Sequence, residues 1–357
     1  MIYLDYQATT PLAPEAREAV IKHLDGPEGT GFGNPHSPHR MGRQAAAAIE
    51  VAREKVAALF PSGGRVIFTG GATEALNLAI RGTSGKGAVA FSAIEHSAVG
   101  DAARAAGPHE VLSVGSDGIC DPAQNLPASA RMIAVMQVNN EIGTRQPVGQ
   151  WAARAKQMGA LMLIDGVQAY GRMPVADADM IAISGHKFHG PKGIGALWVR
   201  DGVELTEQQT GGGQEHGLRS GTLSPALIAG MGAAAALAAE RMDEDAAHVE
   251  VLWERARDVF ADWTLNGSAD DRWRGNLNIR REGLDVGRLI SEVRTVMFSA
   301  GSACASGSGR PSHVLKAIGL SDAQAKSSIR LGFGRYTTLE ELEEAAKLIN
   351  NAAAQQF

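Results

Sequence analysis

Cysteine is scarce in this chain of 357 residues, which contains only Cys120 and Cys304. Two cysteines are too few for a disulfide framework, and so low a count is typical of a reducing compartment. The N-terminus becomes polar within a few residues, so we expect no secretory signal peptide. Long hydrophobic runs are also lacking, because the longest uncharged helical stretch, residues 226–239, is shorter than the roughly 20 residues that span a bilayer. We therefore expect a soluble, cytoplasmic protein without a membrane partner.

A strong excess of either charge is absent as well. The formal net charge is −5, with 20% charged and 44% hydrophobic residues. These values are typical of an ordinary globular protein and give no electrostatic reason to expect nucleic acid as a partner. The length exceeds the usual size of a single hydrophobic core, so it predicts two domains.

Helix-like and strand-like segments alternate along the first two-thirds of the chain. Apolar residues recur at three-to-four spacing in predicted helices at residues 13–24, 41–60 and 72–81. Short apolar runs predict strands at residues 66–68, 87–91, 132–136, 161–164, 180–183 and 196–199. This alternation predicts an α/β fold whose mostly parallel sheet is covered by helices on both faces.

The pattern changes after a predicted Gly- and Ala-rich helix at residues 226–241. The rest of the sequence predicts a charged helix, a strand, a helix, a loop of small residues and a final helix, at residues 248–260, 276–279, 286–293, 299–309 and from 338 onward. These elements indicate a smaller α+β unit. We place the boundary near residues 235–245, with residues 13–240 in a large domain and residues 1–12 and 241–357 in a small one.

Lys187 follows a predicted strand and has Ser, Gly and His as neighbours, in place of the charges that usually surround a solvated lysine. A lysine just beyond a buried strand end is partly desolvated, which makes its amine a candidate nucleophile. Asp165 ends another apolar run, where it can keep a pyridine nitrogen protonated. A lysine that forms a Schiff base and such an aspartate are the two parts that pyridoxal phosphate (PLP) chemistry requires. The alternative is that both are ordinary loop charges.

A glycine turn at Gly70 and Gly71 separates a predicted strand from a helix that begins at Ala72 and Thr73. Free N–H groups at such a helix end favour a phosphate, and the Thr73 hydroxyl adds a donor. The spacing matches neither a Walker loop nor a dinucleotide fingerprint, and a plain strand–turn–helix is the alternative. Ser184 and His186, just before Lys187, can bind the same phosphate.

His96 and Asn140 each follow a predicted strand, at the sheet edge where ligands gather in α/β proteins. An imidazole there can stack on a pyridine ring, although a lone loop histidine is often only exposed. The glycine-rich residues 211–222 predict a loop that lies close to a ligand or a neighbouring subunit. The pair His36 and His39 lacks a matching ligand set, so we expect no stable metal site.

Cys304 lies in a run of small residues, 298–310, that offers nothing to pack a core. A cysteine on an exposed loop is a candidate nucleophile, whereas Cys120, beside an apolar residue and a turn, is interpreted as structural. Arg330 lies in a strand-like run, where it can clamp a substrate carboxylate; a surface ion pair is the alternative.

Seven motifs run in order through nearly the whole chain: YLDYQATTP (3–11), FGNPHS (32–37), GATE (71–74), VNNEIG (138–143), SGHK (184–187), RSGT (219–222) and GSAC (301–304). Together they resemble the cysteine desulfurases, which are PLP enzymes of fold type I in the class V aminotransferase group. The resemblance implies a large domain with a mostly parallel seven-stranded sheet, a smaller α+β domain and a homodimer.

The resemblance also implies the role of each cofactor-binding residue. Lys187 would bind the PLP aldehyde carbon, Asp165 would pair with the pyridinium nitrogen, and His96 would stack on the ring. Gln168 and Asn140 would contact the pyridine 3-oxygen. The implied phosphate ligands are Ala72, Thr73, Ser184 and His186, with Thr222 reaching the phosphate in the partner subunit.

For the substrate, the resemblance implies that Arg330 clamps the carboxylate of L-cysteine, with Asn34 and Asn140 as helpers. Cys304 would take the sulfur as a persulfide, release L-alanine and pass the sulfur to an acceptor such as an iron–sulfur scaffold protein. The loop from Cys304 to Pro311 resembles that of the long-loop housekeeping subgroup. Cys304 is also a candidate transient ligand of an iron–sulfur species.

Three departures from the family pattern bear on these expectations. Gly70 stands where the family usually has Ser, and Gly166 and Tyr170 differ from the residues commonly found after the aspartate. The chain ends at Phe357, just after the last predicted helix, without the longer tail that some members use to dock the scaffold. The sulfur acceptor and the shape of the pocket therefore stay open.

Two rival functions also stay open. A selenocysteine lyase or an aminotransferase would keep Lys187 and Asp165 but would need no exposed Cys304. A non-catalytic sulfur carrier or partner subunit would keep the fold without turnover, and the intact set of Lys187, Asp165, His96 and Arg330 argues against it.

Overall fold

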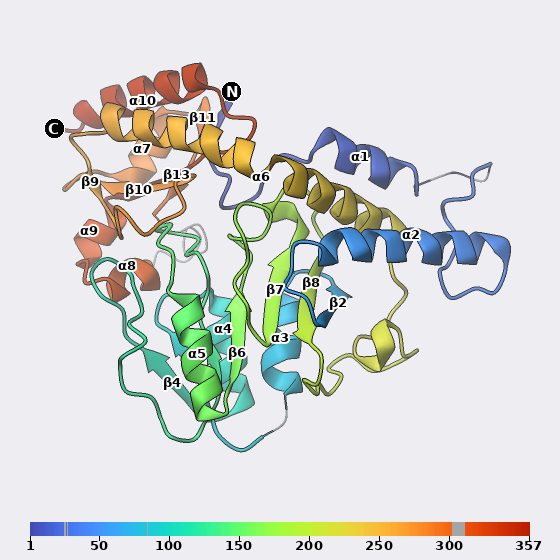
Figure 1. Cartoon of the computed structure of the whole chain (residues 1–357). Helices are drawn as coiled ribbons and strands as arrows, with labels where there is room; N and C mark the ends of the chain where they lie inside the picture. The colour runs from blue at the N-terminus through green and yellow to red at the C-terminus, as the bar shows by residue number, and fades with distance from the viewer. Residues whose placement is uncertain (25, 27, 84, 302–310) are drawn as a thin grey trace.

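The computed structural model describes residues 1–24, 26, 28–83, 85–301 and 311–357. A large sheet with its helices occupies one part of the molecule, and a smaller unit that holds both chain termini lies beside it (Figure 1). The long helix α6, Pro225–Val259, contacts α1, Pro14–Ile21, and α2, Arg40–Ala57, in the large part and α10, Leu339–Ala354, in the small unit.

The large sheet has seven strands in the order β2-β8-β7-β6-β5-β3-β4. Their bounds are Gly64–Thr69 (β2), Ala88–Ser92 (β3), His109–Leu112 (β4), Ala130–Ala134 (β5), Leu161–Asp165 (β6), Met180–Ser184 (β7) and Gly195–Arg200 (β8). All neighbours from β7 to β4 pair in parallel, and only β8 is antiparallel to the strands beside it. The predicted α/β fold with a mostly parallel seven-stranded sheet is confirmed.

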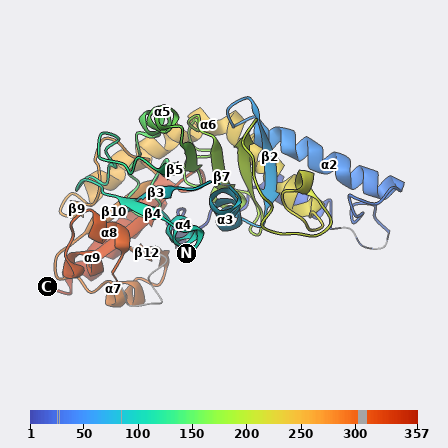
Figure 2. The same ribbon diagram turned by 90° about the horizontal axis from the view of Figure 1, so that it is seen from below.

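Helices cover both faces of this sheet, as the turned view shows (Figure 2). One face packs against α3, Ala72–Gly82, and α4, Ser97–Ala106; the other packs against α5, Val148–Met158, together with α1, α2 and α6. Side chains alternate between the two cores, so that Leu163 joins one while Met162 and Ile164 join the other. Burial on both faces explains why the strands read as continuous apolar runs in the sequence.

The smaller unit is built around a four-stranded antiparallel sheet in the order β12-β13-β10-β9. These strands span Ser299–Ala300 (β12), Ser328–Gly332 (β13), Asn276–Arg280 (β10) and Thr264–Leu265 (β9). The remaining elements are β1 (Ile2–Tyr3), paired in parallel with β11 (Val296–Met297), and helices α7 (Val286–Glu292), α8 (His313–Ala317) and α9 (Asp322–Lys326). Two 3₁₀ turns in the large part, η1 (Gly185–Lys187) and η2 (Glu215–Gly217), complete the set.

The prediction of two separate helices at residues 226–241 and 248–260 is wrong, because α6 is continuous from Pro225 to Val259. Residues 242–247 contain neither Gly nor Pro, and Arg241 supports the helix with ion pairs to Glu244 and Asp245. The change in the sequence pattern along α6 reflects a change in what the helix packs against. Ala235 packs in the core of the large part, whereas Val249 packs in the core of the smaller unit. The domain assignment stays a prediction.

Despite the length of α6, none of the helices in the described ranges is long and apolar enough to cross a membrane.

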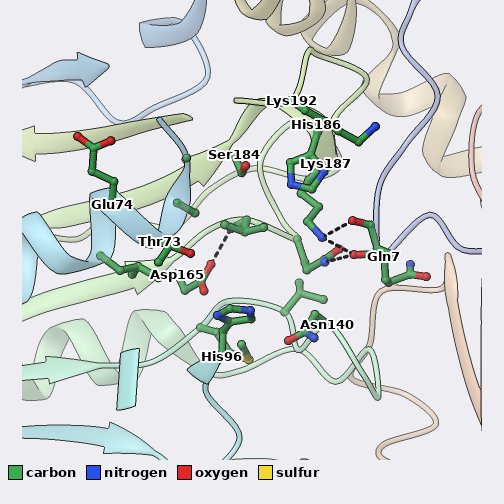
Figure 3. Close-up of a pocket in the computed structure, with 18 of the residues that line it drawn as sticks. Gln7, Thr73, Glu74, His96, Asn140, Asp165, Ser184, His186, Lys187 and Lys192 are labelled. Atoms are coloured by element: carbon green, nitrogen blue, oxygen red, sulfur yellow. Dashed lines mark hydrogen bonds between the residues drawn. The ribbon is translucent and has the colours of Figure 1, made fainter. Parts of the chain in front are cut away.

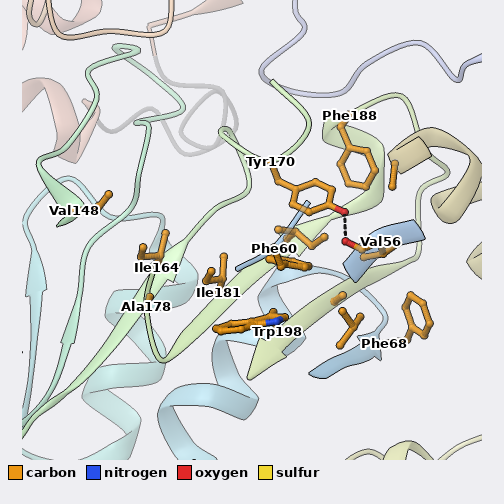
Figure 4. Packing of buried hydrophobic residues seen from close by; sticks show 14 of the residues in the cluster. Val56, Phe60, Phe68, Val148, Ile164, Tyr170, Ala178, Ile181, Phe188 and Trp198 are labelled. Carbon is orange, nitrogen blue, oxygen red and sulfur yellow. Dashed lines mark hydrogen bonds between the residues drawn. The ribbon is translucent and has the colours of Figure 1, made fainter. Parts of the chain in front are cut away.

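Tyr170 belongs to the core between the large sheet and α2 and does not line the cavity described below (Figure 4). Its ring lies 4.9 Å from that of Phe60 and 4.8 Å from that of Phe188. Its hydroxyl donates a 2.7 Å hydrogen bond to the carbonyl of Val56, one of the last carbonyls of α2, which has no partner within the helix. This residue, one of the departures from the family pattern, therefore serves packing.

We expect Tyr170→Phe to lower the free energy of unfolding by about 1 to 3 kcal/mol, because the Val56 carbonyl is left buried without its donor. Urea denaturation of the variant and the wild type measures this difference. Tyr336→Phe, at a position 41% exposed, is the control and should change the free energy of unfolding much less. Equal effects of the two substitutions would contradict the role assigned to the buried bond.

Candidate active site

A cavity of about 820 Å³ lies at the carboxyl ends of the strands of the large sheet (Figure 3). Ten of the predicted site residues line it: Ala72, Thr73, His96, Asn140, Asp165, Gln168, Ser184, His186, Lys187 and Arg330. They come from the last residues of β6 and β7, from segments that follow β2, β3, β5, β6 and β7, and from β13 of the smaller unit. Parallel pairing brings these strand ends to one edge, as expected for a ligand site in an open α/β sheet.

Lys187 ends the 3₁₀ turn η1, directly after β7, and its side chain points into the cavity (Figure 3). Its Nζ donates hydrogen bonds of 2.6 and 2.8 Å to the backbone carbonyls of Gln7 and Ala8. Gln7 and Ala8 line the cavity themselves, so these two hydrogen bonds hold the amine at the cavity wall.

Asp165 is the last residue of β6 and is buried. Burial raises the pKa of its carboxyl, while a 3.0 Å hydrogen bond from the Val167 N–H and the electrostatic influence of His96 and Lys187 lower the pKa. A buried carboxylate of this kind is stabilised by a cation placed beside it. The Asp165 carboxylate is therefore an acceptor that suits a cationic ring nitrogen such as that of PLP.

The turn between β2 and α3 approaches β8 closely. A Cβ at Gly195 would lie 2.7 Å from the Cα of Gly71, so only glycine permits this approach. A Cβ at Gly71 would have only Ser184 Oγ nearby, at 4.0 Å, which leaves room over the start of α3. Thr73, Ser184 and His186 also line the cavity, and this donor set fits a phosphate at a helix N-terminus.

Glu74 is the last residue of the GATE motif, for which the sequence indicated no individual role, and it lines the cavity beside this turn. Its Oε2 accepts a 2.6 Å hydrogen bond from the Gly70 N–H, and its Oε1 accepts one of 2.7 Å from Arg219. The Gly70 N–H is therefore already engaged. The Arg219 guanidinium compensates a negative charge that would otherwise repel a phosphate.

His186 and His96 stand on different sides of the cavity (Figure 3). Burial and the positive charges of Lys187, Lys192 and Arg172 lower the pKa of His186 to about 4, so its ring is neutral at physiological pH. The ring contacts the hydroxyl of Thr9 at 3.1 Å. His96 caps α4, with Nδ1 accepting a 3.2 Å hydrogen bond from the Ala98 N–H, and this bond fixes its ring.

Arg330 reaches the cavity from β13 with only 1% of its side chain exposed. It donates hydrogen bonds of 2.7 Å to Asp5 Oδ1 and of 3.1 Å to the backbone carbonyl of Asn140. Gln168 donates through Nε2 to the Gln7 carbonyl at 3.1 Å, and its Oε1 accepts from Arg172. The Gln168 amide is thus engaged within the protein, where the sequence suggested a contact to a cofactor oxygen.

Three of the predicted residues are not among those that line this cavity. Asn34 and Thr222 are exposed elsewhere on the same chain, and Cys304 lies outside the described residues. The cavity also contains groups that the sequence analysis did not assign, among them Gln7, Ala8 and Lys192. Gln7 and Ala8 belong to the YLDYQATTP motif, but the motif does not indicate that their backbone carbonyls accept hydrogen bonds from Lys187.

The profile of the aminotransferase class-V family matches residues 2–344. A curated relative, the cysteine desulfurase IscS of Rickettsia bellii (strain OSU 85-389), is 40% identical across 98% of this chain and 90% of its own length. Among solved structures, a NifS-like protein from Rickettsia africae ESF-5 has a TM-score of 0.89 and 28% identity, with 99% of each chain covered. A structure of SspA in complex with cysteine has a TM-score of 0.81 and 31% identity, covering 95% of this chain and all of the other.

The lowered pKa of His186 predicts a pH-dependent difference between the wild type and His186→Gln. An unfolded histidine takes up a proton as the pH falls through 6.5, whereas folded His186 resists protonation down to about 4, so the wild type loses stability across this window. As the pH falls from about 7 to 4.5, the free energy of unfolding of the variant should rise relative to that of the wild type by on the order of 1 kcal/mol. This figure already allows for the partial exposure of His186. Denaturant unfolding of both cofactor-free proteins at the two pH values measures this, and a pH-independent difference would contradict it.

Proposed function

We propose that this chain, which belongs to the aminotransferase class-V family and within it to the cysteine desulfurases, removes sulfur from L-cysteine with PLP as its cofactor. The observation that carries the proposal is the arrangement of one cavity. Lys187, Asp165 and Arg330 line it together, and these are the amine, the anion and the carboxylate clamp that the reaction requires.

The residues present fit PLP. Thr73, Ser184 and His186 would hold its phosphate at the start of α3, and Asp165 would face its ring nitrogen, with His96 against the ring. When bound, PLP withdraws electrons from the α-carbon of the amino acid and so weakens its Cβ–S bond. Lys187 would anchor the cofactor and move protons near the α-carbon.

Arg330 would bind the carboxylate of L-cysteine and orient the amino acid, with Asn140 beside it. Cys304 would accept the sulfur. In sum, L-cysteine and the Cys304 thiol give L-alanine and a Cys304 persulfide: the Cβ–S bond breaks, Cβ gains a proton, and an S–S bond forms. The persulfide sulfur would then pass to an acceptor, for which an iron–sulfur scaffold protein is our proposal, in the cytoplasm.

The exposed positions of Asn34 and Thr222 suit a homodimer in which these residues reach the cavity of the partner subunit. The loop that carries Thr222 is fixed to the rest of the chain by buried Glu215, which pairs with Arg53 at 2.7 Å and accepts the Phe68 N–H at 2.6 Å. This anchoring would present Thr222 at a defined place.

The central test compares Cys304→Ala with Cys120→Ala, because these are the two cysteines of the chain. Cys120 is buried, and burial raises the pKa of its thiol to about 12, so it forms almost no thiolate at neutral pH. Sulfide and alanine release from L-cysteine should fall on the order of 100-fold or more in Cys304→Ala and stay within about twofold in Cys120→Ala. If Cys304→Ala releases both products at the wild-type rate, the persulfide role is wrong.

Thr222→Val tests the dimer. If the hydroxyl serves the phosphate of the partner subunit, cofactor affinity should weaken roughly tenfold while the dimer persists. Equilibrium titration of the cofactor-free protein with PLP, together with sedimentation, measures both quantities. Thr206→Val, at another exposed threonine, is the control; identical PLP affinities for the two variants would rule out the contact.

A further inference from the structure

Arg330 is a buried cation whose one carboxylate contact within 4 Å, among the described residues, is Asp5. Nη2 of Arg330 lies 2.7 Å from Asp5 Oδ1, and Nη1 donates to the Asn140 carbonyl at 3.1 Å. In the described ranges Nε makes no hydrogen bond, although it is buried. Nη2 also donates to the Ser299 hydroxyl at 3.4 Å. Because a guanidinium has five N–H donors, Arg330 keeps donor capacity for one more anion while Asp5 holds one end of it.

The backbone fixes Asp5 against the strand that carries Arg330. Asp5 bridges to Gly332, whose N–H donates to the Leu4 carbonyl at 2.8 Å and whose carbonyl accepts from the Tyr6 N–H at 3.3 Å. A Cβ at Gly332 would lie 2.9 Å from the backbone nitrogen of Tyr6, so glycine favours this close approach of the two backbones. The Asp5 carboxylate and the Arg330 guanidinium thus rest on one rigid piece of backbone.

The same N-terminal segment continues to the lysine. Gln7 and Ala8 accept hydrogen bonds from Lys187 Nζ, and Thr10 Oγ1 donates to the His186 carbonyl at 3.0 Å and accepts from the His189 N–H at 2.7 Å. Within six residues, the chain therefore contacts both the cation of the smaller unit and the 3₁₀ turn of the large part.

We propose that Asp5 is a positioning residue for substrate recognition: its carboxylate holds Arg330 aimed at the cavity, so that the remaining guanidinium donors receive the carboxylate of L-cysteine. This inference rests on the proposed function and deepens it. It adds to the substrate site a residue that does not itself line the cavity.

The alternative is that Asp5 competes with the substrate for Arg330. The surroundings of Arg330 favour positioning, because Asp5 is the one carboxylate within 4 Å of the guanidinium among the described residues. Burial raises the pKa of a second buried carboxyl, Glu141, although the positive charge of Arg330 opposes that shift. Glu141 accepts a hydrogen bond from Ser312, away from the cavity lining. Without Asp5, none of the described carboxylates would lie within 4 Å of the guanidinium to hold it in its donor position.

The test uses the PLP-loaded enzyme with Asp5→Asn, which keeps the size of the side chain and removes its charge. Asp245→Asn is the matched control, because Asp245 and Arg335 form a 2.6 Å pair with side chains 14% and 4% exposed, against 18% and 1% for Asp5 and Arg330. Steady-state kinetics with L-cysteine and with its methyl ester separate KM from kcat. Calorimetric binding of L-alanine and L-alaninamide adds a readout that does not depend on turnover.

We expect Asp5→Asn to raise KM for L-cysteine and Kd for L-alanine roughly tenfold, with kcat much less affected, and to leave the ester and the amide unchanged. In an Arg330→Gln background, Asp5→Asn should add nothing, and Asp245→Asn should leave KM within about twofold. An unchanged or lowered KM and Kd would overturn the positioning role, as would equal losses for the ester. If the wild type instead releases no sulfide, the proposed function fails, and L-alanine binding still decides the role of Asp5.

Discussion

Parallel pairing of β3, β5, β6 and β7 brings the carboxyl ends of these strands to one edge of the sheet, and the cavity depends on this constraint. The strands are buried on both faces, so most of their positions are apolar and the polar side chains of the site lie at or beyond the ends of the strands. Asp165 ends β6 and Lys187 follows β7 by three residues, which places a buried anion and an amine on the same cavity. The antiparallel strand β8 then supplies Gly195, which lets the turn at Gly71 approach.

Burial of charge sets the electrostatics around this edge. Glu95, next to His96, is buried and accepts the Met136 N–H at 2.7 Å; burial and the charge of Asp165 raise its pKa well above the usual range. On the other side, burial lowers the pKa of Arg172 to about 10, and its donors go to the Lys187 carbonyl and to Gln168. Carboxyls and guanidinium groups thus gather around an open space, and a ligand with both a cationic nitrogen and anionic groups complements them.

The sequence was informative where a local pattern determines the structure. The strands ending at Asp165 and before Lys187, and the glycine turn before Thr73, follow from apolar runs and turn residues, and the mostly parallel character of the sheet follows from the alternation of strands with helices. The order of the strands does not follow from the sequence. It was uninformative where contacts join distant segments: the carbonyls of Gln7 and Ala8 meet a lysine about 180 residues away. Asp5 has no local feature that distinguishes it from a surface acid. The sequence did not indicate that α6 is continuous. A change in the polarity of residues along a helix reflects what the helix packs against and does not mark where the helix ends.

Residues from both sheets therefore form the site. Lys187 and Asp165 belong to the large sheet, whereas Arg330 belongs to β13 of the smaller one. α6 contributes to both cores, and the segment from Asp5 to Thr10 touches β13 at one end and the 3₁₀ turn of Lys187 at the other. The spacing between the amine and the guanidinium, which decides whether one amino acid can engage both, is accordingly set by these connections and not by either sheet alone. The N-terminal motif of the sequence lies in the segment that makes one of them.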